Sequence, residues 1–230
     1  MQRESARKLG STVQMGAEKS RRLQFEIFPK NAAIRLLAWV VVSLTFLPGA
    51  WGGGSPTGAV KETVDQVFVV LRDQALKDPA KETERRAKLE EIIGQRFDYA
   101  EMAKRTLAAQ WRGLSSKQQE EFVTLFQQFL ANSYVGNVDA YSGEQVEYLK
   151  EREKGDFAEV QTKVVSPKVQ IPLDYRLLQK NGEWRVYDVV IDGVSLMKNY
   201  RGQFSRIINS SSFEALLEKL RSKADLGTSS

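Results

Sequence analysis

Apolar residues recur every three to four positions from residue 60 to about residue 141, which is the spacing of one buried helix face. The spacing predicts four helices: one through 60–71, a strongly charged one that closes at 89–93, one through 98–111, and one from 115 to 138. Asp98 can cap the third helix, and Ser115 with Gln118, or Ser116 with Gln119, matches the capping box that begins a helix. We therefore expect the first half of the folded chain to be helical.

At about residue 144 the period of the apolar residues changes from 3.6 to 2, which predicts β-strands. The strands are expected near residues 146–148, 157–165, 169–177 and 184–191. Asn181-Gly182 is typical of a hairpin turn between the last two strands. Pro172 cannot donate a ladder hydrogen bond, so it indicates an edge strand or a bulge.

Helical spacing returns after Asp192-Gly193, through residues 196–208 and again through 213–220. Gly193 can adopt a positive φ in the turn, and Ser195 can cap the helix that follows. Helices, then a run of antiparallel strands, then helices again define an α+β domain. The curved sheet of such a domain must bury one face against the helices.

Residues 1–52 have the three parts of a secretory signal peptide, with a long basic region before the apolar run. The apolar run extends over twelve residues, from Leu36 to Leu47, and the small-residue pattern Ala50-Trp51-Gly52 follows it. A transmembrane helix needs roughly 20 apolar residues, which disfavours an uncleaved membrane anchor. We therefore expect a protein that works outside the cytoplasm, with a signal peptide at 1–52, a flexible linker at 53–58, a single domain at 59–224 and a polar tail at 225–230.

The net charge of +5 lies wholly in this leader. Of the 34 basic and 29 acidic residues, eight basic and three acidic ones precede Gly53, and the remainder holds 26 of each. A nucleic-acid-binding protein keeps its positive charge on the folded surface, where it meets phosphates. The basic isoelectric point therefore predicts no nucleic-acid partner.

The chain has no cysteine and no histidine, which excludes disulfides, thiolate or imidazole metal sites and histidine-dependent nucleophilic catalysis. The best carboxylate pair is Asp188 and Asp192. Four residues apart on a strand, these groups would be roughly 13 Å apart, too far for a retaining glycosidase and long for an inverting one. The simpler interpretation is a strand carboxylate satisfied by hydrogen bonds and a turn aspartate. We therefore predict no enzymatic activity, no cofactor and no metal.

The apolar pattern leaves open what fills the space between sheet and helices. The apolar side chains can form a solid core, or they can stand apart and line a cleft for an apolar ligand. A resemblance separates these alternatives. The segments that carry it are Trp111-Arg-Gly-Leu114 through Phe122, Phe126 and Phe129 to Tyr134, and Trp184-Arg-Val-Tyr187-Asp188 through Asp192-Gly193-Val-Ser195-Leu196 to Tyr200-Arg201-Gly-Gln203-Phe204.

Together these segments resemble the MlaC family, the periplasmic phospholipid-binding components of the Mla pathway, also called toluene-tolerance auxiliary proteins. The resemblance runs from about residue 60 to residue 224, and the leader agrees with it independently. It implies a fold similar to the nuclear-transport-factor-like (NTF2-like) cone, in which a curved antiparallel sheet and helices enclose a deep apolar cavity. Family members hold the acyl chains of a phospholipid inside and leave the head group outside.

The resemblance also implies partners and site residues. Family members carry lipid between an outer-membrane lipoprotein–porin complex and an inner-membrane ABC transporter with its substrate-binding ring protein, which maintains outer-membrane lipid asymmetry. For this chain it implies a monomer with no cofactor. The candidate lining residues, each of which could instead belong to a plain core, are Phe126, Phe129, Val169, Ile171, Leu173, Tyr175, Trp184, Val186, Leu196, Tyr200 and Phe204.

Two other functions stay open beside the phospholipid carrier. A hopanoid or another apolar lipid could occupy the same fold, and a solid core would favour a ligand-free periplasmic interaction or assembly module. An enzyme on the same cone is disfavoured by the missing histidines. Arg201 is expected either to pair with Asp188 or to lie at the mouth of the cavity.

Overall fold

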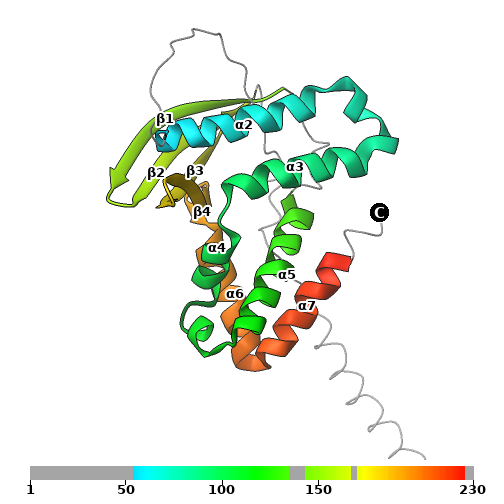
Figure 1. The fold of residues 1–230 in the computed structure, drawn as a ribbon, viewed down its shortest axis with the longest axis vertical. Helices are drawn as coiled ribbons and strands as arrows, with labels where there is room; N and C mark the ends of the chain where they lie inside the picture. Colours follow the sequence, from blue (N-terminus) through cyan, green and yellow to red (C-terminus); the bar gives the residue numbers. More distant parts are fainter. Residues whose placement is uncertain (1–53, 135–142, 167–169, 226–230) are drawn as a thin grey trace, which may run out of the picture. The chain divides into compact units, whose positions relative to one another are not determined.

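The computed structural model describes residues 54–134, 143–166 and 170–225 (Figure 1). The predicted signal peptide, Val138, Val169 and residues 226–230 of the predicted tail lie outside the described residues. Within them, helices come first, an antiparallel sheet follows, and two helices end the chain. The α+β class with a sheet packed against helices is therefore confirmed.

Helices α2 (Pro56–Arg72) and α3 (Glu82–Arg96) pack against each other and are joined by the short turns η2 (Gln74–Lys77) and η3 (Pro79–Lys81). The Ser55 hydroxyl caps α2 by accepting a hydrogen bond from the backbone N–H of Gly58, and Pro56 occupies the first turn. The helix thus takes in residues 56–58, which the sequence predicts to be part of a flexible linker. That assignment is wrong there because Ser-Pro acts as a helix start.

The next segment contains α4 (Tyr99–Leu107), η4 (Ala108–Gly113) and α5 (Ser116–Tyr134). Asp98 caps α4 as predicted, but α4 ends before Trp111 because Ala108 has a φ of 50°, in the left-handed region. Of the two predicted capping boxes, reciprocal bonds confirm the one between Ser115 and Gln118. The Gln118 N–H donates to the Ser115 hydroxyl at 3.3 Å, and the Ser115 N–H donates to the Gln118 amide oxygen at 3.0 Å.

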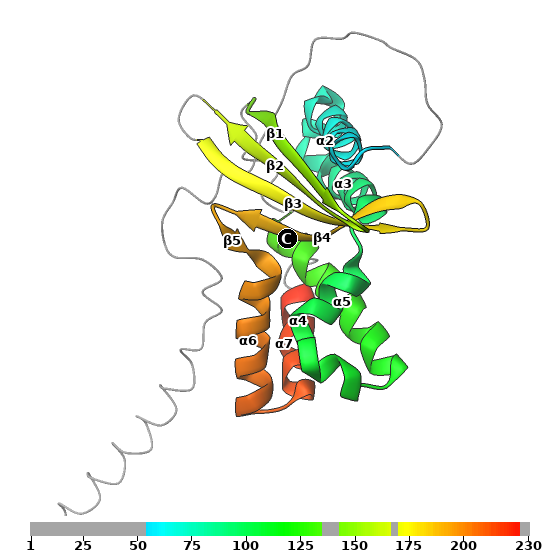
Figure 2. The same cartoon turned by 90° about the vertical axis from the view of Figure 1, so that its left-hand side faces the viewer.

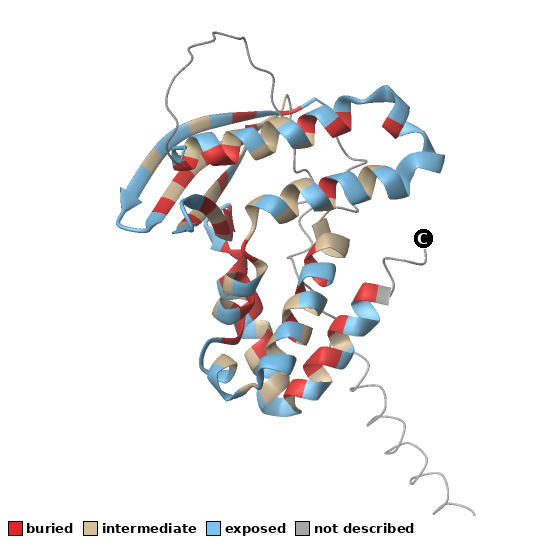
Figure 3. Cartoon of the chain, viewed as in Figure 1, coloured by how far each residue is buried: buried red, intermediate tan, exposed pale blue. Residues whose placement is uncertain are grey.

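The five strands form one antiparallel sheet in the order β1-β2-β3-β4-β5. Their bounds are β1 (Gln145–Lys154), β2 (Phe157–Val165), β3 (Gln170–Lys180), β4 (Glu183–Ile191) and β5 (Val194–Ser195). The predicted hairpin turn joins β3 to β4, where Asn181 and Gly182 both have positive φ. Figure 3 shows buried residues that alternate with more exposed ones along the strands, as in β2, where every second residue from Ala158 to Val164 is buried.

Pro172 lies on β3, an interior strand, so the prediction of an edge is wrong. The register shift between β3 and β4 falls at Arg176/Leu177, so Pro172 marks no bulge either. Pairing with β4 starts only at Leu173, and the Pro172 carbonyl accepts a bond from the Asp192 N–H at 2.9 Å. The proline stands where the β3–β4 ladder ends, so its missing N–H costs no ladder bond.

Helices α6 (Leu196–Ser210) and α7 (Phe213–Asp225) complete the domain. α4 packs on α6, α5 packs on α7, and α4 and α6 also contact β4 (Figure 2). The Ser195 hydroxyl caps α6 by accepting from the Lys198 N–H, and Gly193 has a φ of 76°, both as predicted. None of the helices in the described ranges is long and apolar enough to cross a membrane.

Candidate functional site

The candidate lining residues on the strands share one face of the sheet, here named the lining face. Ladder partners point to the same side, and Leu177 pairs with Val186. Alternation along β3 and β4 then puts the other strand positions on that side too. The described candidates on the lining face are Ile171, Leu173, Tyr175, Trp184 and Val186.

Helix α2 packs on this face above β1 and β2. Its Thr57 N–H donates at 2.6 Å to the carboxylate of Glu151, a β1 residue whose ladder partner is Val160. Leu173 is 3% exposed and Val186 1% exposed, whereas Tyr175 is half-buried. Leu173 and Val186 therefore give the lining face a buried apolar area on β3 and β4.

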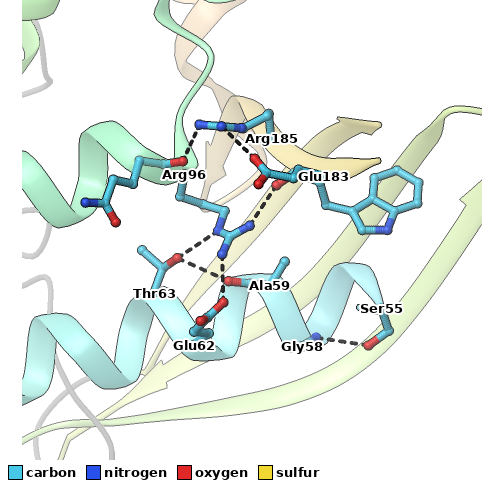
Figure 4. Close-up of polar contacts among 10 residues, drawn as sticks. Ser55, Gly58, Ala59, Glu62, Thr63, Arg96, Glu183 and Arg185 are labelled. Carbon is cyan, nitrogen blue, oxygen red and sulfur yellow. Dashed lines mark hydrogen bonds and ion pairs between the residues drawn. The ribbon is translucent and has the colours of Figure 1, made fainter. Parts of the chain in front are cut away.

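Arg96 joins α2, α3 and β4 beside the lining face (Figure 4). Its guanidinium donates to the Thr63 hydroxyl at 2.9 Å, to the Glu62 carboxylate at 2.9 Å and to the Trp184 carbonyl at 3.0 Å. The neighbouring Arg185 donates to the backbone carbonyl of Gln95. These bonds hold α2 and the end of α3 against β4, so they fix part of the cover of the lining face.

Four of the helical candidates pack directly against one another. Phe126 and Phe129 on α5 meet Tyr200 and Phe204 on α6 at ring-centroid distances of 5.4–5.8 Å, mostly edge to face. Phe122 joins them at 5.7 Å from Phe126. We name these five residues the aromatic cluster; each is at most 1% exposed. Leu196 is also buried, at the first turn of α6.

The aromatic cluster ends at a pair of tyrosine hydroxyls. The hydroxyls of Tyr134 and Tyr200 are 2.9 Å apart. Burial raises the pKa of Tyr134 to about 12, although its bond to Tyr200 opposes the shift, and burial also raises the pKa of Tyr200 well above its ordinary value. Both phenols are therefore uncharged at neutral pH, as an apolar site requires.

Asp188 has a structural role: it is the strand carboxylate satisfied by hydrogen bonds that the sequence favours. Its carboxylate accepts from the Ser195 hydroxyl at 2.6 Å, from the Met197 N–H at 3.1 Å and from the Arg176 guanidinium at 3.0 Å. The bonds connect β4 to the start of α6. Arg201 does not pair with Asp188: its Nε donates to the Arg105 carbonyl at 2.9 Å.

One small pocket is lined by none of the predicted residues. It has a volume of about 190 Å³ between α3, α4 and α5, and its wall includes Glu90, Tyr99, Gln127 and Gln128. Ligand pockets for drug-sized molecules are typically about 300–1,000 Å³ and mostly apolar. This pocket is too small and too polar for the acyl chains of a phospholipid.

The structure thus places the described candidates in two groups, the lining face and the aromatic cluster, with Leu196 outside both at the start of α6. Among the described residues, the ring contacts of Phe126, Tyr200 and Phe204 stay within α5 and α6, and Phe122 extends the cluster to Phe213 on α7. Tyr148, a β1 residue of the lining face, and the anchoring Arg96 are not among the site residues predicted from the sequence. The alternation of Val146 and Tyr148 was the available signal for the former; no sequence signal identified Arg96.

The comparisons with known proteins agree on this fold. A phospholipid-binding protein from Ralstonia solanacearum, solved in complex with a phospholipid, matches with a TM-score of 0.66 and 22% sequence identity, over 76% of this chain and 99% of that one. The chain is therefore an α+β domain of the same fold as that protein.

The family follows from the sequence profile of the MlaC protein family, which matches residues 61–222. The chain belongs to the MlaC family. A curated relative is the intermembrane phospholipid transport system binding protein MlaC of Haemophilus influenzae, which is 25% identical over 126 residues. The match spans 52% of this chain and 59% of that relative.

Proposed function

We propose that this chain is a periplasmic phospholipid carrier that holds acyl chains against the lining face. The observation that carries the proposal is membership of the MlaC family across residues 61–222. The relative from Haemophilus influenzae is named as a phospholipid transport binding protein, and the structural neighbour from Ralstonia solanacearum holds a phospholipid. The shared, covered face of Leu173 and Val186 supplies apolar surface of the required kind.

The energetics favour a carrier with such a surface. Burial of one methylene group contributes about 0.8 kcal/mol, so two chains of about sixteen carbons oppose transfer into water by roughly 25 kcal/mol. Unassisted passage of a phospholipid across an aqueous compartment is therefore negligible. Apolar contact along the chains supplies retention without a close reading of the head group, which allows release to a partner.

The proposed partners are an outer-membrane lipoprotein–porin complex and an inner-membrane ABC transporter with its substrate-binding ring protein. A monomer that exchanges lipid with both would help to maintain outer-membrane lipid asymmetry. A balanced charge after the leader supports this role, because a shuttle must leave an anionic membrane surface after it exchanges lipid.

A vesicle-transfer assay tests the proposal. The full-length protein is expressed in a Gram-negative host, purified from the periplasm and delipidated, and then incubated with donor vesicles of fluorescent phosphatidylglycerol and unlabelled acceptor vesicles. We expect transfer in proportion to protein concentration, and a matched loss of lipid from the donors. Transfer no faster than with an equal amount of a cytosolic control protein would contradict the proposal and favour the ligand-free interaction module.

A further inference from the structure

The hydroxyl oxygen of Tyr148 is a buried polar atom without a hydrogen-bond partner in the described parts of the chain. Buried polar groups in native proteins nearly always have a partner, because an unpaired one costs stability. Two of the polar groups near it on the sheet already have partners. Glu151 accepts from the Thr57 N–H, and the Thr162 hydroxyl donates to the Leu173 carbonyl. The Tyr148 hydroxyl is therefore an unused donor.

Register places this hydroxyl among the candidate lining residues. Tyr148 on β1 pairs with Thr162 on β2, and Thr162 pairs with Leu173 on β3. Residues in such a row point to the same side of the sheet, so Tyr148 belongs to the lining face. α2 packs over β1 and β2, so the phenol lies between the sheet and this helix.

The charges around Tyr148 limit what it can bind. Burial raises the pKa of Tyr148 well above its ordinary range, and the nearby Tyr175 and Asp65 raise it further, so the phenol keeps its proton and can donate. Asp65 and Glu151 bring negative charge to this part of the face. A phosphate would be repelled there, whereas an uncharged oxygen would not.

We propose that the Tyr148 hydroxyl donates a hydrogen bond to an ester carbonyl oxygen of the bound lipid. The inference rests on the phospholipid-binding function proposed above and adds the chemical class that the site selects. A glycerolipid with ester-linked chains has an uncharged acceptor at the junction of head group and tails. An ether-linked lipid lacks the carbonyl, and a hydrocarbon ligand such as a hopanoid ring system lacks the ester altogether.

The hydroxyl is enclosed, so a lipid reaches it only by parting the side chains that now cover it. Removal of the hydroxyl should therefore have different effects on the lipid-free and the lipid-bound protein. Without lipid, the hydroxyl is an unpaired buried group, and its removal should leave stability unchanged or raise it. With lipid, its removal should weaken retention.

The test compares Tyr148→Phe with the full-length protein purified from the periplasm and delipidated. Each protein is loaded from vesicles of dioleoyl phosphatidylcholine mixed equally with its diether analogue, and the retained lipids are counted by mass spectrometry. We expect the natural sequence to retain the diester about fivefold more than the diether, the effect of one net hydrogen bond. Tyr148→Phe should retain both equally. Tyr187→Phe is the matched control, since Tyr187 packs on Phe157 and under Arg105 away from the lining face, and it should keep the preference.

Thermal unfolding without lipid is the second readout. The midpoint of Tyr148→Phe should equal that of the natural sequence or exceed it by about 2–4 °C. A lower midpoint with an unchanged diester preference would assign the hydroxyl to the protein's own fold and overturn the inference. Equal retention of both lipids by the natural sequence would overturn it while the carrier function stands. Retention of neither lipid would overturn both.

Discussion

Asp188→Asn tests the junction that carries α6 on the sheet. The carboxylate accepts three hydrogen bonds, from Ser195, Met197 and Arg176, and is itself only 3% exposed. An asparagine keeps one oxygen and loses the charge, so at least one buried donor loses its acceptor. Bonds to a charged group contribute roughly 1.5–3 kcal/mol each, but Arg176 is 31% exposed, and solvent lowers its share. We expect the free energy of unfolding to fall by about 2–3 kcal/mol, a drop of roughly 5–10 °C in the thermal midpoint.

Urea unfolding followed by circular dichroism and tryptophan fluorescence measures this loss. Asp192→Asn is the matched control, because Asp192 is an exposed turn residue with a φ of 48°, a conformation that asparagine tolerates. The control should change stability by no more than about 0.5 kcal/mol. Equal effects of the two substitutions would refute the assignment of Asp188 as the anchor of the β4–α6 junction.

Three further predictions concern the lining face, the aromatic cluster and the cap of α4. Leu173→Lys places a charge on the lining face and should abolish lipid retention in the fraction that stays folded. Gln161→Lys, on the opposite face of the sheet, is the control and should retain lipid as before. A folded Leu173→Lys protein that copurifies with normal lipid would show that Leu173 is not part of the site. Phe126→Ala should cost about 3–5 kcal/mol of unfolding free energy in urea titrations, because the ring is fully buried in the aromatic cluster, and a loss below about 1 kcal/mol would show that the cluster is loosely packed. Burial raises the pKa of Asp98, but hydrogen bonds from Lys180 and the backbone outweigh it, so the pKa lies below its ordinary value. The carboxylate therefore stabilises the fold fully above its unfolded pKa of about 3.9, and this contribution is lost as the pH falls through the folded pKa. Asp98→Asn should reduce the drop in urea midpoint between pH 6 and pH 2.5, and an unchanged drop would contradict this.

Local chemistry was readable from the sequence, and tertiary packing was not. The helix cap depends only on the side chains of Ser115 and Gln118, and the hairpin turn depends only on the backbone angles of Asn181 and Gly182. Both are local, so the sequence predicts them. Pro172 misled the prediction because its missing N–H is compatible with a ladder end as well as with an edge. No sequence pattern predicts that the backbone angles of Ala108 leave the right-handed helical region.

In the candidate site, too, the face of a strand residue can be predicted from the sequence, whereas the contacts between helices cannot. Alternation along β3 sufficed to put Leu173 and Tyr175 on one face, since side-chain direction follows the strand period. That Val186 shares this face depends on the β3–β4 register, which skips Tyr187. Helical spacing marks Phe126 and Tyr200 as buried, but it does not say what they touch. Their ring-to-ring contacts depend on how α5 meets α6, which is a tertiary fact.

Native mass spectrometry of the protein purified from the periplasm of a Gram-negative host, followed by solvent extraction, tests the central claim most directly. We expect a mass excess over the polypeptide that matches the extracted phospholipid and that is absent from the Leu173→Lys variant. A bare polypeptide mass with no phospholipid in the extract would contradict the carrier function.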